Sequence, residues 1–222
     1  MRIAQPEGTR GSLKWMQRAV AWRPDLLQPA ALPTLDWVSP LPLDDFAEYR
    51  DAAFLSRLGL ARLSPALAEF WPRRGPQWDG LARFEGGVVL AEAKAHLAEF
   101  DSPASAAGPA SAERIAEAFA RVQADMGVAP AQWDRVYYQY ANRLAHLWFL
   151  RTHGVEAHLL LIGFLGDEER RGPKDAGDWE TAYRQADLAL GLPRDHALSP
   201  FIHHLCPTVD ALTTPASGKT TG

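Results

Sequence analysis

The sequence predicts a mixed α/β fold, in which a mixed central sheet is flanked by helices. Two apolar strands, residues 77–84 and 88–96, are joined through Glu85, Gly86 and Gly87, and a longer apolar strand spans residues 155–165. Helical segments precede, separate and follow these strands, so we expect helices on both faces of one sheet. The strands are too few and the glycines too sparse for a doubly wound dinucleotide-binding fold.

The composition limits the class of protein. At 222 residues, 47% of them hydrophobic, the chain can form one full-sized core. A single cysteine, Cys206, excludes an internal disulfide, and the first residues lack the apolar run of a signal peptide. The longest apolar run, residues 155–166, is too short to span a membrane. We therefore expect a cytoplasmic protein that does not contact membranes.

The elements of the N-terminal half follow from helix signals. Residues 12–22 predict a helix with Ser12 as its cap, and the proline-rich connector that follows completes an N-terminal region, 1–42, packed on the core. The main domain spans residues 43–209. It opens with a helix from Asp44 or Asp45 to residue 58, which Gly59 stops, and a shorter helix over residues 61–70.

The later elements alternate between helix and strand. Residues 111–126 predict a helix capped by Ser111, and residues 130–151 predict a long helix closed by Gly154. After the apolar strand we expect a charged loop, a helix over residues 179–190 and a short strand within residues 200–209. The tail, residues 210–222, has the composition of a disordered end.

Three charged residues fall within strands that are predicted to be buried. Glu92 and Lys94 are two residues apart, so in a strand they share one face. A turn at Gly86 and Gly87 places Asp79 opposite Lys94 and diagonal to Glu92, with Cβ atoms roughly 6–8 Å apart. A three-residue loop would instead pair Asp79 with Ala93 and turn it to the other face.

In the favoured register, two carboxylates can share one divalent cation beside an ammonium group. Without a metal, two close carboxylates in a half-dry site repel each other, and one would take a proton. The simpler interpretation is a salt bridge between Asp79 and Lys94 at the sheet end, with Glu92 in solvent.

Asp79 followed by Glu92-Ala93-Lys94 on the next strand resembles the signature of the PD-(D/E)XK nuclease superfamily, which has the restriction-endonuclease-like fold. The resemblance covers about residues 46–165. It implies that Asp79 and Glu92 bind Mg²⁺ or Mn²⁺ with the Ala93 carbonyl, and that Lys94 is the catalytic lysine. Such oxygen ligands suit these ions, which supply a nucleophile and stabilise charge on a phosphate.

Two further residues extend this resemblance. Gln139, on the predicted helix 130–151, matches a glutamine of RecB-like members, although Arg143 stands where some of them carry tyrosine. On that helix Gln139 lies in one polar wedge with Arg135, Arg143 and His146, which is either a site-facing wedge or a solvated face. A glutamate of the first core helix often completes the metal site, for which Glu48 is the candidate and Glu69 a weaker one.

The formal net charge of −4 argues against a strong, sequence-independent grip on nucleic acid. A local track remains open, because Arg73 and Arg74 precede the hairpin and Arg135 and Arg143 share the predicted helix with Gln139. These four are the candidate substrate-binding residues. A zinc site at His203, His204 and Cys206 is set aside, because adjacent histidines of a strand face opposite ways.

The leading hypothesis is therefore a metal-dependent nuclease that cleaves phosphodiester bonds of DNA in preference to RNA. One alternative is a non-catalytic module on the same fold that binds nucleic acid or protein. Another is a hydrolase of small phosphorylated substrates. The acidic balance and the eight tryptophans favour a binding module, whereas the spacing of Asp79, Glu92 and Lys94 favours an enzyme.

Overall fold

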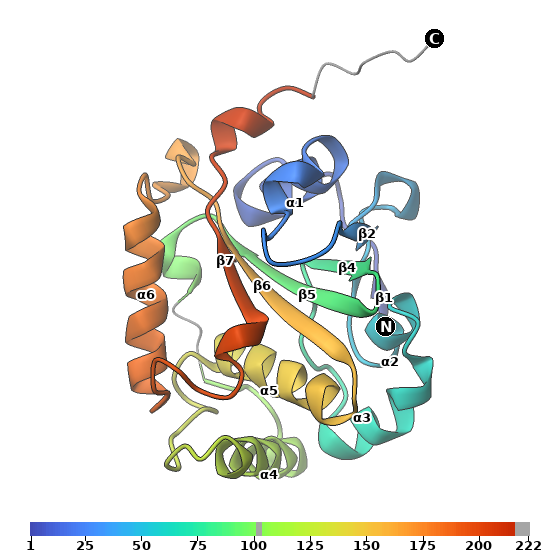
Figure 1. Cartoon of the computed structure of the whole chain (residues 1–222), viewed down its shortest axis with the longest axis vertical. Helices are drawn as coiled ribbons and strands as arrows, with labels where there is room; N and C mark the ends of the chain where they lie inside the picture. The colour runs from blue at the N-terminus through green and yellow to red at the C-terminus, as the bar shows by residue number, and fades with distance from the viewer. Residues whose placement is uncertain (101–103, 216–222) are drawn as a thin grey trace.

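The computed structural model describes residues 1–100 and 104–215, and at its centre lies a five-stranded sheet (Figure 1). The strand order is β2-β4-β5-β6-β7. These strands span Asp36–Ser39, Gly80–Phe84, Gly87–Lys94, Glu156–Gly163 and Ile202–Leu205. A second sheet of two short strands pairs β1 (Arg2–Ile3) with β3 (Glu48–Tyr49).

Helices flank the central sheet. They are α1 (Gly11–Trp22), α2 (Ala52–Arg57), α3 (Ser64–Phe70), α4 (Pro109–Asp125), α5 (Tyr138–Thr152) and α6 (Ala176–Ala189). Short 3₁₀ turns occupy Pro24–Leu27, Pro42–Asp44, Ala61–Leu63, Leu97–Glu99, Glu168–Arg170, Ser199–Phe201 and Val209–Leu212. Figure 1 shows α6 beside the β7 edge and α4 outside α5.

The sheet is mixed, as the sequence predicts. Strands β2, β4 and β5 run antiparallel to their neighbours, whereas β5, β6 and β7 are parallel. Because a parallel pair requires a crossover, the chain between β5 and β6 forms α4 and α5, and the chain between β6 and β7 forms α6. This order confirms the mixed α/β class with helices against the sheet.

Two apolar clusters cover the two faces of the sheet. On one face Met16 and Ala19 of α1 pack with Ala91 and Ala93 of β5. On the other face a larger cluster contains Leu90 of β5 and side chains of α2 to α6. Successive residues of β5 therefore face α1 and α5 in turn, which fixes the side on which each charged residue lies.

The register of the β4–β5 hairpin differs from both registers that the sequence suggested. Phe84 pairs with Gly87 across a two-residue turn of Glu85 and Gly86, and the last pair is Gly80 with Ala91. Gly87 belongs to the ladder, where it pairs with Phe84. A Cβ on Gly87 would meet the Phe84 ring at 2.2 Å and the Glu156 carbonyl oxygen at 2.5 Å, so this position requires glycine. Gly86, with φ +87°, is the turn residue.

The ladder ends at the pair of Gly80 with Ala91; continued by one residue in the same register, it would bring Asp79 opposite Glu92 and not opposite Lys94. The prediction that Asp79 pairs with Lys94 was wrong by two residues. Because side chains alternate with a period of two, that shift leaves Asp79 on the face expected for it. The alternative pairing of Asp79 with Ala93 is also excluded.

The helix predicted over residues 130–151 begins only at Tyr138. Trp133 is fully buried, and its indole N–H donates to the Leu190 carbonyl at 2.8 Å, which holds the preceding segment in turns. Tyr137 then adopts a left-handed conformation with φ 47°. Arg135 consequently lies outside α5, so the predicted polar wedge loses this residue, while Gln139, Arg143 and His146 remain on the helix.

The helix predicted from Asp44 or Asp45 to residue 58 was also wrong in its first half. Asp44 ends a 3₁₀ turn, Asp45 has φ 48°, and Glu48 belongs to strand β3. Only Ala52–Arg57 is helical, and Gly59 with φ +80° follows it, as expected. The predicted caps Ser12 and Ser111 lie inside α1 and α4, which start at Gly11 and Pro109 with no side-chain cap from the described residues.

The ends of the chain contribute more structure than their composition suggests. The proline-rich connector contains β2, an edge strand of the main sheet. At the other end Leu212 is fully buried in the turn Val209–Leu212, although residues 210–222 were expected to be disordered. The rest of that predicted tail, residues 216–222, lies outside the described residues. No described helix combines the length and apolar character needed to cross a bilayer.

Candidate active site

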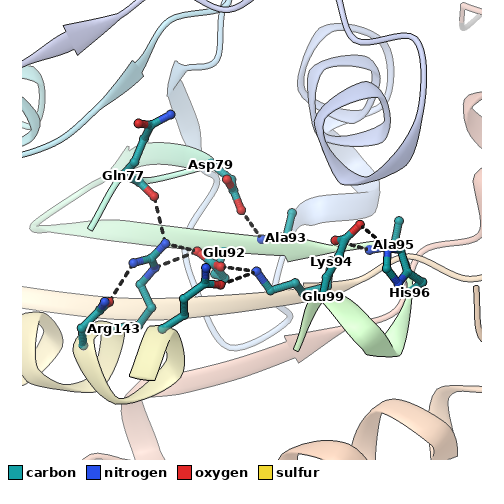
Figure 2. Close-up of polar contacts among 11 residues, drawn as sticks. Gln77, Asp79, Glu92, Ala93, Lys94, Ala95, His96, Glu99 and Arg143 are labelled. Carbon is teal, nitrogen blue, oxygen red and sulfur yellow. Dashed lines mark hydrogen bonds and ion pairs between the residues drawn. The ribbon is translucent and has the colours of Figure 1, made fainter. Parts of the chain in front are cut away.

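The site lies where β4 stops and β5 continues. β4 begins at Gly80, and before it Trp78 pairs with Tyr49 of β3, so the chain leaves the main ladder at Asp79. The half-buried Asp79 carboxylate accepts a hydrogen bond from the backbone N–H of Ala93 at 2.8 Å (Figure 2). One acid is thereby held against the end of the neighbouring strand.

The backbone of Ala93 faces the side of β5 on which β4 has already ended, where Asp79 lies. The carbonyl of Lys94 accepts from Phe164 N–H, which follows β6, so the main chain of Lys94 points toward β6. Because successive residues of a strand point their backbone groups to opposite sides, the Ala93 carbonyl points toward the side that β4 has vacated. The carbonyl predicted as a ligand and the Asp79 carboxylate therefore share one edge of β5.

Glu92 is the most heavily paired acid of the site. Its Oε1 accepts from Lys94 Nζ at 2.6 Å, and its Oε2 accepts from Arg143 Nε at 2.7 Å and pairs with Arg143 Nη2 at 2.6 Å (Figure 2). The side chains of Glu92, Lys94 and Arg143 are only 7%, 11% and 7% exposed. Two cations thus compensate one buried carboxylate.

Lys94 connects the strand to α5. Besides its ion pair with Glu92, its Nζ donates to Oε1 of Gln139 at 3.1 Å. Gln139 is exposed in the first turn of α5, so the ammonium lies between a buried strand and an open helix end. No ion pair joins Lys94 to Asp79 within the described chain, so the simpler salt-bridge interpretation was wrong.

Arg143 is held by a complete set of partners. Its Nη2 donates to the Gln77 carbonyl at 2.9 Å, its Nη1 donates to Asn142 Oδ1 at 2.7 Å, and its guanidinium lies 4.9 Å from the centre of the Trp78 ring. A guanidinium fixed on this many sides is a rigid part of the site. It occupies the position where some RecB-like members carry tyrosine.

The acids differ in their electrostatic state. Burial raises the pKa of Asp79 well above its ordinary value, and the negative charges of Glu92 and Glu48 raise it further against the opposing charge of Lys94. Burial likewise raises the pKa of Glu48, with Glu92 adding to the effect and the hydrogen bond from Gln77 opposing it. Both carboxyls therefore lack sufficient compensating positive charge.

Glu92 and Lys94 show the opposite balance. Burial alone would raise the pKa of Glu92, but the charges of Arg143 and Lys94 outweigh it and lower that pKa. Burial would lower the pKa of Lys94, but Glu92 and Asp79 outweigh it and raise that pKa. At neutral pH the site therefore contains a carboxylate at Glu92 and an ammonium at Lys94.

Glu48 lies close to this network although it is not on a helix. Its Oε2 accepts hydrogen bonds from the side chains of Gln77 and, at 3.1 Å, Gln5. The candidate acid that was expected on a helix therefore lies on strand β3. Glu69, the weaker candidate, is exposed on α3.

The donor chemistry of the site fits Mg²⁺ or Mn²⁺ in part. Asp79, Glu48 and the Ala93 carbonyl offer oxygen ligands, and the raised pKa of Asp79 marks a deficit of positive charge that a cation would relieve. Both oxygens of Glu92 are already paired. Within the part of the chain that the structure describes, no group of three or more His, Cys, Asp or Glu side chains is arranged to hold a metal ion.

The remaining predicted residues separate into two groups. Arg73 and Arg74 are exposed; Arg74 lines a cavity that Gln139 and Arg143 also line, whereas Arg73 lines only a neighbouring cavity, and Arg143 lies within the site. Arg135 is exposed, 3.9 Å from Asp134, and lines neither cavity. Sequence reasoning missed Gln77 and Asn142, which position Arg143; Gln77 does so through its main-chain carbonyl, so its residue type carried no signal for this role.

Comparison with protein-family models, with curated proteins and with solved structures finds no match to this chain.

Proposed function

We propose that this chain is a metal-dependent nuclease that hydrolyses phosphodiester bonds, in DNA in preference to RNA, on a restriction-endonuclease-like core. The observation that carries the proposal is the convergence of Asp79, Glu92, Lys94 and Gln139 at the end of one hairpin. An antiparallel hairpin followed by a parallel strand across helices α4 and α5 supports the proposed core.

In this proposal Asp79, the Ala93 carbonyl and Glu92 hold the ion, with Glu48 as a further acid. Glu92 would contribute an oxygen now bonded to Lys94 or Arg143. When bound, the ion supplies a nucleophile at neutral pH and stabilises charge on the scissile phosphate. Its positive charge beside Asp79 would also offset the burial, and the repulsion from Glu92 and Glu48, that raise the pKa of that carboxyl.

The chain's own cations act on the phosphate. The raised pKa of Lys94 keeps its amine protonated at neutral pH, so Lys94 stabilises negative charge and orients a water molecule by donating hydrogen bonds. It does not act as a general base. Gln139, whose Oε1 accepts from Lys94 Nζ, positions that ammonium at the open end of α5.

The test is cleavage of end-labelled single-stranded, double-stranded and branched DNA and RNA with Mn²⁺, Mg²⁺ or EDTA. We expect cleavage that requires metal. Asp79→Asn and Lys94→Met should each lower its rate by about 10²–10³-fold, the loss typical of removing one group that stabilises transition-state charge. The matched controls are Asp195→Asn and Lys174→Met, which change exposed residues far from the hairpin in sequence.

Asn at position 79 retains an oxygen that can accept from Ala93 N–H, so this variant tests charge with little change in the hydrogen-bond pattern. Metal-independent cleavage, absence of cleavage with every substrate, or equal rates for the variants and their controls would contradict the proposal.

One observation favours a second candidate, a non-catalytic nucleic-acid-binding module on the same fold. Arg143 and Lys94 already neutralise Glu92, so the buried charge at this position is stable without an ion. A module of this kind would bind nucleic acid but would release no heat on titration with Mn²⁺ and would leave every substrate intact.

A further inference from the structure

Two open cavities continue outward from the candidate site. The inner cavity is lined by Gln139, Arg143 and Asn142, and the outer one by Arg73 and Ser111. Each has a volume of about 330 Å³, and both are lined by Arg74 and Tyr138. We name the two cavities together the Arg74 groove. The two cavities meet at Arg74 and Tyr138, and the inner one borders Gln139 and Arg143, which bond Lys94 and Glu92 of the candidate site.

The charge of the Arg74 groove is positive although the chain is acidic overall. No described acidic side chain lines either cavity. Arg73 and Arg74 are exposed, and neither forms a salt bridge with any residue in the described ranges. By contrast, the hollow beside α1 is lined by four acidic residues and two lysines: Asp167, Glu168, Glu169, Asp210, Lys14 and Lys174.

Two helix ends reinforce this positive charge. The inner cavity reaches the start of α5 at Tyr138, and the outer cavity reaches the start of α4 near Gly108. Neither helix has a side-chain cap from the described residues or an acidic residue in its first turn. Backbone N–H groups and the positive end of the helix dipole at these positions favour an anion, such as a phosphate.

Tyr138 adds a flat apolar surface between the two cavities. Its ring is half-buried and packs edge-on against Phe119, with ring centres 6.2 Å apart, while the residue lines both cavities. An aromatic ring between cationic positions is the arrangement by which proteins stack the bases of a single strand while they hold its backbone. A site that bound only inorganic anions would not require an aromatic ring.

We propose that the Arg74 groove binds a single strand of nucleic acid, with phosphates near Arg73, Arg74 and the two helix ends and a base stacked on Tyr138. The inference rests on the proposed nuclease function, and it deepens it by naming single-stranded nucleic acid as the substrate class. Each cavity has the volume of a small-ligand pocket, which suits one nucleotide unit. In a duplex the bases are paired and stacked on one another, so none of them is free to stack on Tyr138.

The experiment measures binding without catalysis. Fluorescence anisotropy in EDTA follows a labelled 12-residue oligodeoxythymidylate, an oligouridylate of the same length and a 12-base-pair duplex, with the full chain and at several salt concentrations. The variants are Arg74→Gln, Tyr138→Leu and Tyr138→Phe. Arg135→Gln is the matched control, because Arg135 is exposed and close in sequence but lies outside the groove.

We expect tighter binding of the single strands than of the duplex. Arg74→Gln should reduce the slope of log K against log salt by about 0.7, the contribution of one phosphate contact to a single strand. Tyr138→Leu should weaken binding about 5-fold or more, whereas Tyr138→Phe, which keeps the ring, and Arg135→Gln should bind like the unaltered chain.

Equal affinity for duplex and single strand, binding by Arg74→Gln and Tyr138→Leu that equals that of the unaltered chain, or no binding of any probe would overturn the proposal. Because metal is absent, the outcome is independent of hydrolysis. Single-strand binding that depends on Arg74 and Tyr138, found together with no cleavage in Mn²⁺, would sustain the groove and reject the nuclease. Metal-dependent cleavage with no effect of either residue on binding would do the reverse.

Discussion

The two faces of strand β5 differ although they alternate along the same eight residues. Toward α1, Ala91 and Ala93 belong to a dry cluster of apolar side chains. Toward α5, Glu92 and Lys94 are just as buried but are charged, and they find their partners in Arg143 and Gln139. Burial alone therefore does not distinguish the candidate site from the opposite face of β5. The difference lies in the charged and polar partners that α5 supplies.

The largest effect should come from breaking the charged face. Glu92→Ala leaves Arg143 and Lys94 buried without their carboxylate, and we expect a loss of about 3–5 kcal/mol in the free energy of unfolding, measured by urea denaturation. The control, Glu85→Ala in the exposed turn, should stay within about 0.5 kcal/mol of the unaltered chain. Equal losses in the two variants would show that the pairs contribute nothing to stability.

A second measurement tests whether water reaches the buried side chains of α5 that lie beside these charges. His146 is fully buried among Phe54, Phe70, Trp71 and Trp78, and burial lowers its pKa to about 3. Below pH 6.5 the unfolded chain takes up a proton at this residue and the folded chain does not. Stability should therefore fall toward pH 3 by about 1.4 kcal/mol per pH unit from this residue.

His146→Gln removes this titration and keeps a donor for the Asn142 carbonyl. The stability of the unaltered chain should thus decline more steeply than that of the variant between pH 6 and pH 4 when both are followed by denaturation. If the stabilities of the two proteins change with pH in parallel, His146 is protonated in the folded chain and water reaches this side of α5.

The smallest effect should come from crowding the apolar face. A Cβ on Gly80 would lie 2.4 Å from Met16 Cε and 2.7 Å from a Trp37 ring carbon, so Gly80→Ala should cost about 1–3 kcal/mol, depending on how far Met16 yields. Thermal denaturation measures the loss. Mn²⁺ binding by the folded variant should not change, and a parallel loss of metal binding would show that the two faces are not independent.

The local parts of the fold could be predicted from the sequence. The strand pair, the apolar strand β6 and helix α1 follow from periodicity and turn residues, and the two-residue error in the hairpin did not move Asp79 to the other face. The E-x-K spacing predicted that Glu92 and Lys94 share a face because a strand repeats every two residues. The nearness of Asp79 to them followed from the same rule.

The parts that depend on distant partners could not be predicted. Trp133 ends up bonded to Leu190, 57 residues away, and that contact delays the start of α5 to Tyr138. Glu48 is in a strand because Ile3 pairs with it, although the sequence around Glu48 predicted a helix. The bond from Arg143 to Glu92 likewise depends on how α5 packs on the sheet, which no local pattern determines.

The most direct test of the central claim is a calorimetric titration of the chain with Mn²⁺ at neutral pH. Asp79 and Glu48 both lack compensating charge, and Asp79 is the one bonded to the end of β5. The unaltered chain and Asp195→Asn should therefore bind the ion alike, and Asp79→Asn should bind it at least about tenfold more weakly, a cost of about 1.4 kcal/mol. No binding by the unaltered chain, or equal binding by Asp79→Asn, would contradict a metal site at the hairpin end.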